Sequence, residues 1–261
     1  MIILIHTSKT MRSPANAADA SLSRPLLLRR TRELSTYLKT LSAADIKAIM
    51  HVSPKLAQTT HDLLQGWTDA SASQRAAIDS FLGDIYSGMQ VGAWSQADRL
   101  YAQDHLRILS GLYGILRPLD GIFPYRLEMG YKLPDAKYGN LYNFWEDEIA
   151  KTLPPEEVIV DLSAVEYGKT ITPYVNDERI ITPRFLTVSP TTHEPIFVVV
   201  HAKIARGAFA SWMIRNRIED EEKLKDFNEI GYVYNAELST PKSPVFICQE
   251  FGGIGLSVRL T

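Results

Sequence analysis

Residues 107–130 read RILSGLYGILRPLDGIFPYRLEMG and combine four glycines, two prolines and three arginines with large apolar and aromatic side chains. Glycine weakens helices and strands, and proline removes a backbone donor, so regular core elements avoid this mixture. Gly111 and Gly114 allow close backbone approach or left-handed turns, and Arg117 stands before a proline, which favours extended backbone. We interpret the segment as a shaped surface on a rigid body that serves a ligand.

The polar side chains of this segment allow two interpretations. In one, Tyr113 and Tyr125 stack on bases. Arg117 and Arg126 then hold phosphates, and Glu128 anchors an arginine or acts as an acid–base group. In the other interpretation, the segment is a structural meander whose arginines pair with nearby carboxylates. The sequence leaves both open.

The composition is that of an ordinary globular protein. The chain has 261 residues, of which 45% are hydrophobic and 22% are charged. The net charge of −2 does not single out a nucleic-acid binder. The charge is uneven, because Lys and Arg outnumber Asp and Glu by 15 to 11 in residues 1–132, whereas acidic residues lead by 19 to 13 in residues 133–261. A local basic surface is compatible with this distribution.

Targeting, redox and metal signals are absent from the sequence. The only cysteine, Cys248, excludes an intrachain disulfide and stands in an apolar run that favours a core position. The N-terminus lacks the features of a signal peptide, and no segment approaches the ~20 apolar residues of a membrane span. The six histidines form no ligand pair of the HExxH kind. We therefore expect a cytoplasmic protein with no membrane association, metal site or cofactor.

Apolar runs and helical periodicity predict the main elements. The predicted strands cover residues 1–6, 157–163, 179–188, 195–203, 232–238 and 244–251. The predicted helices cover residues 25–40, two short stretches within 43–67, 72–82, a helix capped by Ser95 and Asp98 that continues to about Leu109, 140–153, 204–218 and 219–227. This order predicts one α+β domain over residues 1–261, with a mixed central sheet surrounded by helices and the first strand near its centre.

The stretch HTSKT, residues 6–10, directly follows the first predicted strand. The ammonium of Lys9 and the neighbouring hydroxyls, including that of Thr10, are donors suited to a phosphate or carboxylate. The stretch lacks the Gly-x4-Gly frame of a P-loop, so an ordinary polar turn is the alternative interpretation.

Two further stretches carry basic residues at informative spacing. If residues 201–217 are helical, Lys203, Arg206 and Arg217 lie within about 60° on one face, which suits a polyanion but equally a solvated helix face. Residues 45–64 have the outline of a helix-hairpin-helix element, with Lys55 at the hairpin. Because the hairpin lacks Gly-x-Gly, an ordinary helical hairpin is the alternative.

Several of these blocks together resemble the YaaA family of peroxide-stress proteins, formerly an uncharacterised protein family. Residues 105–130 match the family pattern RxLSGLYGxLRPLDxxxPYRLEMG almost letter for letter. Similar blocks follow in the family's order: FLGDIYSGMQ (81–90), LYNFW (141–145), EYGKTI (166–171), AKIARG (202–207) and GYVY (231–234). The resemblance extends from Met1 to about Tyr234.

The resemblance implies a family-specific, single-domain mixed α/β fold with a positively charged cleft and a helix-hairpin-helix element that binds duplex DNA. It also implies a role in limiting peroxide damage, linked to intracellular iron. Where the family commonly has SPAKTL, this chain has HTSKTM, so Lys9 and Thr10 are retained. The usual LASxEY appears as LSAVEY, with Ser163 and Ala164 exchanged, and VSPKLA resembles ISDKLA, which supports Lys55 as a backbone contact.

The favoured hypothesis is a peroxide-stress protein that binds duplex or distorted DNA and limits oxidative damage. The expected contacts to phosphates come from Lys55, Arg117, Arg126, Lys203 and Arg206, with Tyr113 or Tyr125 stacking on bases. This requires cations that are distant in the sequence to converge on one concave face.

The alternative hypothesis is an enzyme that acts on a nucleotide or a damaged nucleobase. Lys9 and Thr10 would hold the anion, or Lys9 would act as a nucleophile. Glu128 or Glu166 would serve as general acid or base. A third hypothesis, an iron-handling protein, has little support in the pattern of potential ligands, and the oligomeric state is not determined by the sequence.

Overall fold

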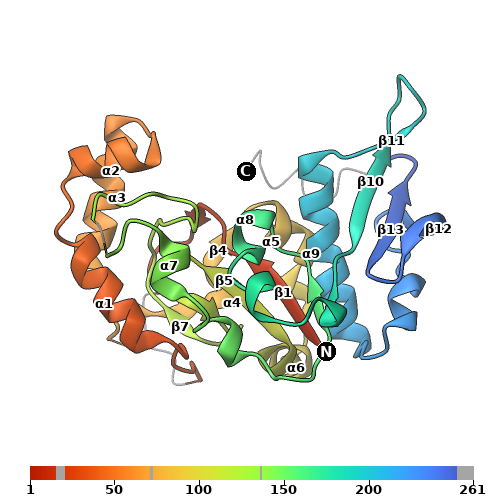
Figure 1. Cartoon of the computed structure of the whole chain (residues 1–261), viewed down its shortest axis with the longest axis horizontal. Helices are drawn as coiled ribbons and strands as arrows, with labels where there is room; N and C mark the ends of the chain where they lie inside the picture. Colours follow the sequence, from red (N-terminus) through yellow and green to blue (C-terminus); the bar gives the residue numbers. More distant parts are fainter. Residues whose placement is uncertain (16–20, 71–72, 136, 252–261) are drawn as a thin grey trace.

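The centre of the fold is a five-stranded mixed sheet. The computed structural model describes residues 1–15, 21–70, 73–135 and 137–251 (Figure 1). The strand order is β6-β5-β1-β8-β9, in which β1, β5, β8 and β9 are parallel and β6 is an antiparallel edge. These strands are β1 (Ile2–His6), β5 (Leu106–Ser110), β6 (Gly114–Leu116), β8 (Ile159–Asp161) and β9 (Ile180–Ile181). As predicted, β1 is central, and it is buried along its whole length.

The sequence predicted a helix that continues to about Leu109, but the end of this range forms the strand β5. The predicted capping box is confirmed, because the Ser95 hydroxyl accepts from the Asp98 amide and the Asp98 carboxylate accepts from the Ser95 amide. However, α6 (Gln96–His105) ends at His105. The next five residues are all buried and pair with β1 on one side and β6 on the other, so sheet pairing overrides helical continuation.

The structure contains a second sheet of four strands, whereas the sequence predicted a single mixed sheet. Its order is β11-β10-β13-β12, made of β10 (Arg184–Val188), β11 (Pro195–Ile196), β12 (Tyr232–Thr240) and β13 (Ser243–Cys248). The single strand predicted over 179–188 is divided between the two sheets as β9 and β10. The strand predicted over 195–203 is also wrong beyond Ile196, because α9 (Val199–Asn216) begins there and packs against β10 and α5.

Several helices are shorter than predicted. The helix over 25–40 is α1 (Leu28–Leu38), so Pro25 precedes it, and the helix over 140–153 shrinks to α7 (Leu141–Trp145). In place of a helix over 72–82, α4 (Ala77–Ser80) lies between two-residue strands. The remaining helices are α2 (Ala43–Met50), α3 (Pro54–Gly66), α5 (Asp84–Met89) and α8 (Val165–Gly168). The two-residue strands β2 (Thr10–Met11) and β3 (Arg75–Ala76) pair with β4 (Phe81–Leu82) and β7 (Gly121–Ile122), respectively. Short 3-10 turns occur at η2 (Val91–Ala93), η3 (Ala150–Thr152), η4 (Thr172–Tyr174), η5 (Asp177–Arg179) and η6 (Glu222–Asp226).

The two ends of the molecule carry different structures. Helices α1, α2 and α3 lie at one end, and the second sheet lies at the other, with the five-stranded sheet between them (Figure 1). A continuous apolar core includes Ile5 of the central sheet as well as Phe185 and Phe246 of the second sheet. The predicted single α+β domain is therefore confirmed. No described helix is long and apolar enough to cross a membrane.

Two glycines bring α5 and α9 into backbone contact. A Cβ atom on Gly207 would lie 1.9 Å from the Ile85 carbonyl oxygen, and one on Gly88 would lie 2.0 Å from the Ile204 carbonyl oxygen. Any larger residue at either position must therefore separate the helices. This close crossing places the first turns of α9, which carry Lys203 and Arg206, beside the carboxyl end of β1.

Candidate functional site

A cavity of about 440 Å³ lies at the carboxyl end of β1. In open α/β sheets, ligands bind in the crevice outside the carboxyl ends of parallel strands, and here β1 lies between two parallel neighbours. The lining residues come from five segments and are His6, Thr7, Ser8, Lys9, Gly83, Asp84, Ile85, Tyr86, Glu128, Ala164, Glu166, Tyr167 and Lys203. The fold therefore brings together Lys9, Glu128 and Glu166, all three predicted as catalytic, together with the predicted anion contact Lys203.

An exposed ion pair stands at this cavity. The Lys9 ammonium lies 3.0 Å from a Glu128 carboxylate oxygen, and the two side chains are 55% and 20% exposed. The Arg126 guanidinium donates to the Lys9 carbonyl oxygen at 3.3 Å, so this predicted cation supports the loop that carries Lys9. The pair is thus exposed on its Lys9 side, while Glu128 is mostly covered.

Glu166 enters the cavity from the start of α8. One of its carboxylate oxygens accepts the Gly130 amide proton at 2.7 Å, and its carbonyl oxygen accepts from the Tyr142 hydroxyl at 2.9 Å. The backbone contact holds the carboxylate in one orientation, and no described residue donates a hydrogen bond to its second oxygen. Together with Asp84, Glu128 and Glu166 thus contribute three carboxylates to the lining of the cavity that contains Lys9.

His6 forms part of the buried wall and was missed by the sequence reasoning as a site residue. Its Nδ1 atom lies 3.1 Å from the Ala164 amide, and its ring stacks on Tyr167 at 5.0 Å between centroids. Burial, reinforced by the charges of Arg206 and Lys203, lowers the pKa of His6 to about 3. Burial also raises the pKa of Tyr167, whose hydroxyl accepts from Thr7. The available signal was the position of His6 at the end of a wholly apolar run.

Arg206 and Arg217 do not form the predicted stripe with Lys203. Arg206 is largely buried and donates to the Ser163 carbonyl oxygen at 3.1 Å, which supports the loop that leads to Glu166. Arg217 follows the end of α9 in a left-handed conformation and pairs with Asp98 at 2.8 Å. The stripe prediction is therefore wrong for Arg217, because the helix ends before it.

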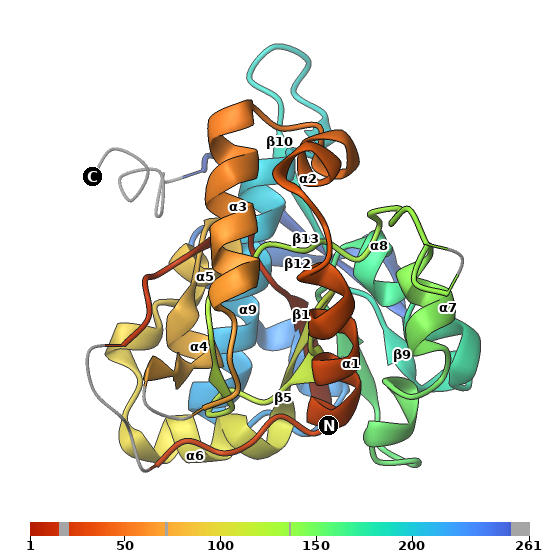
Figure 2. The same ribbon diagram turned by 90° about the vertical axis from the view of Figure 1, so that its left-hand side faces the viewer.

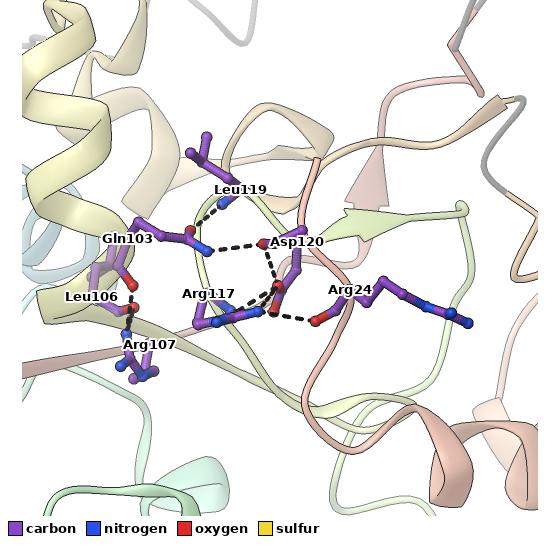
Figure 3. Close-up of polar contacts among 8 residues, drawn as sticks. Arg24, Gln103, Leu106, Arg107, Arg117, Leu119 and Asp120 are labelled. Carbon is purple, nitrogen blue, oxygen red and sulfur yellow. Dashed lines mark hydrogen bonds and ion pairs between the residues drawn. The ribbon is translucent and has the colours of Figure 1, made fainter. Parts of the chain in front are cut away.

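Arg117 belongs to a structural network away from the cavity (Figure 3). Its guanidinium lies 3.0 Å from the carboxylate of Asp120, which is fully buried, and also donates to the Arg24 carbonyl oxygen. The Arg24 side chain points away from this network (Figure 3). The structural meander, which was one of the two interpretations, describes Arg117, and the predicted convergence of this residue with Lys9 is wrong.

The two predicted stacking tyrosines lie in the core. Tyr113 and Tyr125 are only 1% and 4% exposed. The Tyr113 hydroxyl accepts from the Trp67 indole at 2.9 Å, and that of Tyr125 is hydrogen-bonded to Ser110. Their ring faces are covered, so stacking on bases is incompatible with this packing.

The glycines predicted at the binding surface serve the packing of the protein itself. A Cβ on Gly111 would lie 2.5 Å from the Leu127 carbonyl oxygen. Gly114 has a φ of +69° and packs against the Trp145 ring. The expected close approach and left-handed turn are both present, but they fit protein neighbours.

The two remaining predicted contacts lie outside the cavity lining. Thr10 is exposed on β2, which pairs with β4. Lys55 is exposed in the first turn of α3, after the N-cap Ser53. In Figure 2 the α2–α3 hairpin lies in the upper part of the molecule, whereas α8 lies near mid-height. Whether this hairpin acts as a DNA-binding helix-hairpin-helix stays a prediction.

A second, larger cavity adjoins the first. It has a volume of about 970 Å³ and shares Gly83 and Tyr86 with the Lys9 cavity. Arg12 and Arg75 contribute to its lining, and neither forms an ion pair with another described residue. Across the described ranges, no three His, Cys, Asp or Glu side chains are grouped so that they could hold a metal ion.

Comparison with known proteins identifies the family. Residues 1–238 match the family model described as "Peroxide stress protein YaaA". The chain belongs to the YaaA family. A "UPF0246 protein" of Salinispora tropica is 59% identical over 259 residues, which cover 99% of this chain and 98% of the relative. A relative in Clostridium beijerinckii is 38% identical over 254 residues, covering 94% and 97%, and one in Roseobacter denitrificans is 38% identical over 237 residues, covering 88% and 92%. The resemblance found in the sequence motifs is thus confirmed.

Proposed function

We propose that this YaaA-family member acts in the peroxide stress response by binding DNA, with one nucleotide of the strand held in the Lys9 cavity. The observation that carries the proposal is the convergence of Lys9, Lys203, Glu128 and Glu166 from four separate segments on one cavity. The ammonium groups suit a phosphate, and the carboxylates suit the donor groups of a base or sugar.

Cations beyond the cavity favour a strand over a free nucleotide. Arg12 and Arg75 line the adjoining cavity, so phosphates on either side of the bound nucleotide would find further positive charge. Lys55, exposed on the α2–α3 hairpin, is a candidate contact to the backbone of a duplex. These groups give a path of contacts longer than one nucleotide.

Replacing Lys9 by Ala should weaken DNA binding and reduce its salt dependence. If Lys9 neutralises one phosphate, the slope of log K against log salt becomes less negative by about 0.9. Anisotropy titrations of a labelled duplex and of a labelled single strand at several salt concentrations measure this slope. Because Lys9 is exposed, the substitution leaves the fold intact.

Lys225→Ala is the matched control, since Lys225 is also exposed in a pair with a glutamate, Glu222. Its slope and affinity should equal those of the wild type. No binding of either DNA at low salt would reject the proposed function, and an unchanged slope for Lys9→Ala would remove the Lys9 cavity from the DNA-binding surface.

A nucleotide-directed enzyme is the second candidate, favoured by the two glutamates beside Lys9. Glu128 and Lys9 are within 3.0 Å, and Glu166 is held by the Gly130 amide, which is an arrangement able to move a proton on a bound nucleotide. Glu128→Gln separates the two functions. Binding alone should become tighter, because a negative charge leaves the phosphate site, whereas acid–base catalysis through Glu128 should fall by about 10²-fold or more.

The measurement pairs the duplex titration with product detection by mass spectrometry after incubation with mononucleotides and with peroxide-treated DNA. Lys225→Ala again serves as the control. Tighter binding by Glu128→Gln with no turnover in the wild type supports a binding protein. Wild-type turnover that disappears in Glu128→Gln establishes the enzyme.

A further inference from the structure

The hydrogen bonds of His6 fix its tautomer. Its Nδ1 atom faces the backbone amide of Ala164 at 3.1 Å, and an amide can only donate, so Nδ1 is the acceptor and Nε2 carries the proton. Within the described ranges, no residue forms a hydrogen bond with Nε2. The atom is not fully buried, because it is absent from the buried polar atoms that lack a partner. His6 lines the Lys9 cavity, and from this position we infer that its Nε2–H group faces the cavity.

The surroundings of His6 keep the imidazole neutral. Arg206 and Lys203 approach from α9, Tyr167 stacks from α8, and the Tyr86 hydroxyl from α5 donates to the His6 carbonyl oxygen. Burial disfavours the charged ring most, and the two cations add to this effect, although the carboxylates of Asp84, Glu128 and Glu166 line the same cavity. A neutral imidazole of this kind donates one hydrogen bond without taking up a proton.

Depth within the cavity separates His6 from the lysine. His6 is 8% exposed at the end of the buried strand β1, whereas the Lys9 side chain is 55% exposed. A nucleotide in this cavity therefore meets the ammonium group at the exposed level and the imidazole at the buried level. The charged phosphate suits the exposed level, and an uncharged base suits the buried one.

We propose that His6 donates its Nε2–H to a carbonyl oxygen or ring nitrogen of the base, and so selects ligands that carry a base over those that carry phosphate alone. The inference rests on the proposed function, because it assumes a nucleotide in the cavity. A purely structural His6 would need only Nδ1, which holds the Ala164 amide. A structural role leaves the Nε2–H group without a partner among the residues that the structure describes.

Two substitutions separate the two nitrogens. Asn at position 6 can accept from the Ala164 amide through its side-chain oxygen but has no donor at the Nε2 position. Gln can place an amide donor where Nε2 lies. The probes are thymidine monophosphate, whose base has two carbonyl acceptors, and deoxyribose 5-phosphate, which has no base, and both affinities are measured by calorimetry.

We expect His6→Asn to bind thymidine monophosphate about tenfold more weakly, as for the loss of one hydrogen bond to a buried group, and to bind deoxyribose 5-phosphate as the wild type does. His6→Gln should recover part of the loss. Equal weakening of both probes, or wild-type affinity of His6→Asn for the nucleotide, overturns the proposal. Wild-type binding of duplex DNA without any binding of the nucleotide also overturns it and leaves the proposed function intact.

Nitrogen NMR of the wild-type protein tests His6 independently of any ligand. We expect the Nε2–H tautomer and a ring that stays neutral through the mildly acidic range. An Nδ1–H tautomer, or titration near the ordinary pKa of about 6.5, overturns the inference even if DNA binds. Loss of DNA binding by the wild type rejects the proposed function, and with it the role of His6 toward a base.

Discussion

Asp120→Ala should destabilise the protein by about 3–5 kcal/mol, the range measured when one partner of a buried ion pair is removed. Asp120 is fully buried, and its carboxylate accepts from the Arg117 guanidinium, the Arg117 amide at 2.8 Å and the Ser23 hydroxyl at 2.7 Å. The Ser23 hydroxyl in turn accepts from Gln103. The substitution removes the acceptor of the Arg117 amide and of the Ser23 hydroxyl, and leaves the Arg117 guanidinium with the Arg24 carbonyl oxygen. Urea denaturation at neutral pH measures the loss.

The control is Glu222→Ala, which breaks the exposed pair with Lys225 and should change the free energy of unfolding by less than about 1 kcal/mol. Asp120→Asn keeps the shape of the side chain but turns an NH2 group toward donors. Its loss of unfolding free energy should therefore fall between the losses of Asp120→Ala and Glu222→Ala. A loss below 1 kcal/mol for Asp120→Ala would contradict the structural role given to Arg117, and would return this arginine to the candidates for phosphate binding.

The segment 107–130 shows why local sequence leaves function open. Its glycines, prolines and arginines were interpreted as a ligand surface, yet Arg117 serves Asp120 and Tyr113 serves the core. Only its C-terminal part reaches the cavity, through Glu128. The same composition suits a binding loop and a buried meander, because both need bent backbone and satisfied polar groups. Partners distant in sequence, such as Ser23 for Asp120, decide between them.

The central strand β1 was predictable because a short, continuous apolar run of this kind is typical of a strand that is buried on both faces. The strand β5 was not, since LRILS continues the pattern of the capped helix α6 and becomes a strand only through pairing with β1 and β6. Similarly, the valines at 199 and 200 continue an apolar run typical of a strand but form the start of α9, which packs on α5.

The candidate site was predictable in part for the same reason. Lys9 stands directly after a strand whose central position was predicted, so its place at the carboxyl end of the sheet followed. His6 was missed, because its role depends on a backbone amide 158 residues away at Ala164. Lys203 and Arg206 were both predicted as phosphate contacts, but only tertiary structure shows that Lys203 lines the cavity while Arg206 holds the Ser163 carbonyl.

Gly207→Ala should destabilise the protein by about 3 kcal/mol, at the upper end of the range for added volume in a packed core. The new methyl group would lie 1.9 Å from the Ile85 carbonyl oxygen and 2.9 Å from the Met89 amide nitrogen, and both are backbone atoms that cannot rotate away. Helices α5 and α9 must therefore move apart. Because α9 carries Lys203 and α5 carries Tyr86, DNA binding should weaken together with stability.

Gly66→Ala is the matched control, since Gly66 ends α3 and a Cβ there would meet no atom within 4 Å. Alanine is the better helix former, so this variant should be as stable as the wild type or more stable, by about 0.5–1 kcal/mol. Chemical denaturation of both variants gives the comparison, and the duplex titration follows the site. If Gly207→Ala unfolds at the wild-type denaturant concentration, the backbone contact between α5 and α9 is not as close as described. If it is destabilised but binds DNA with wild-type affinity, the crossing supports the fold without positioning the Lys9 cavity.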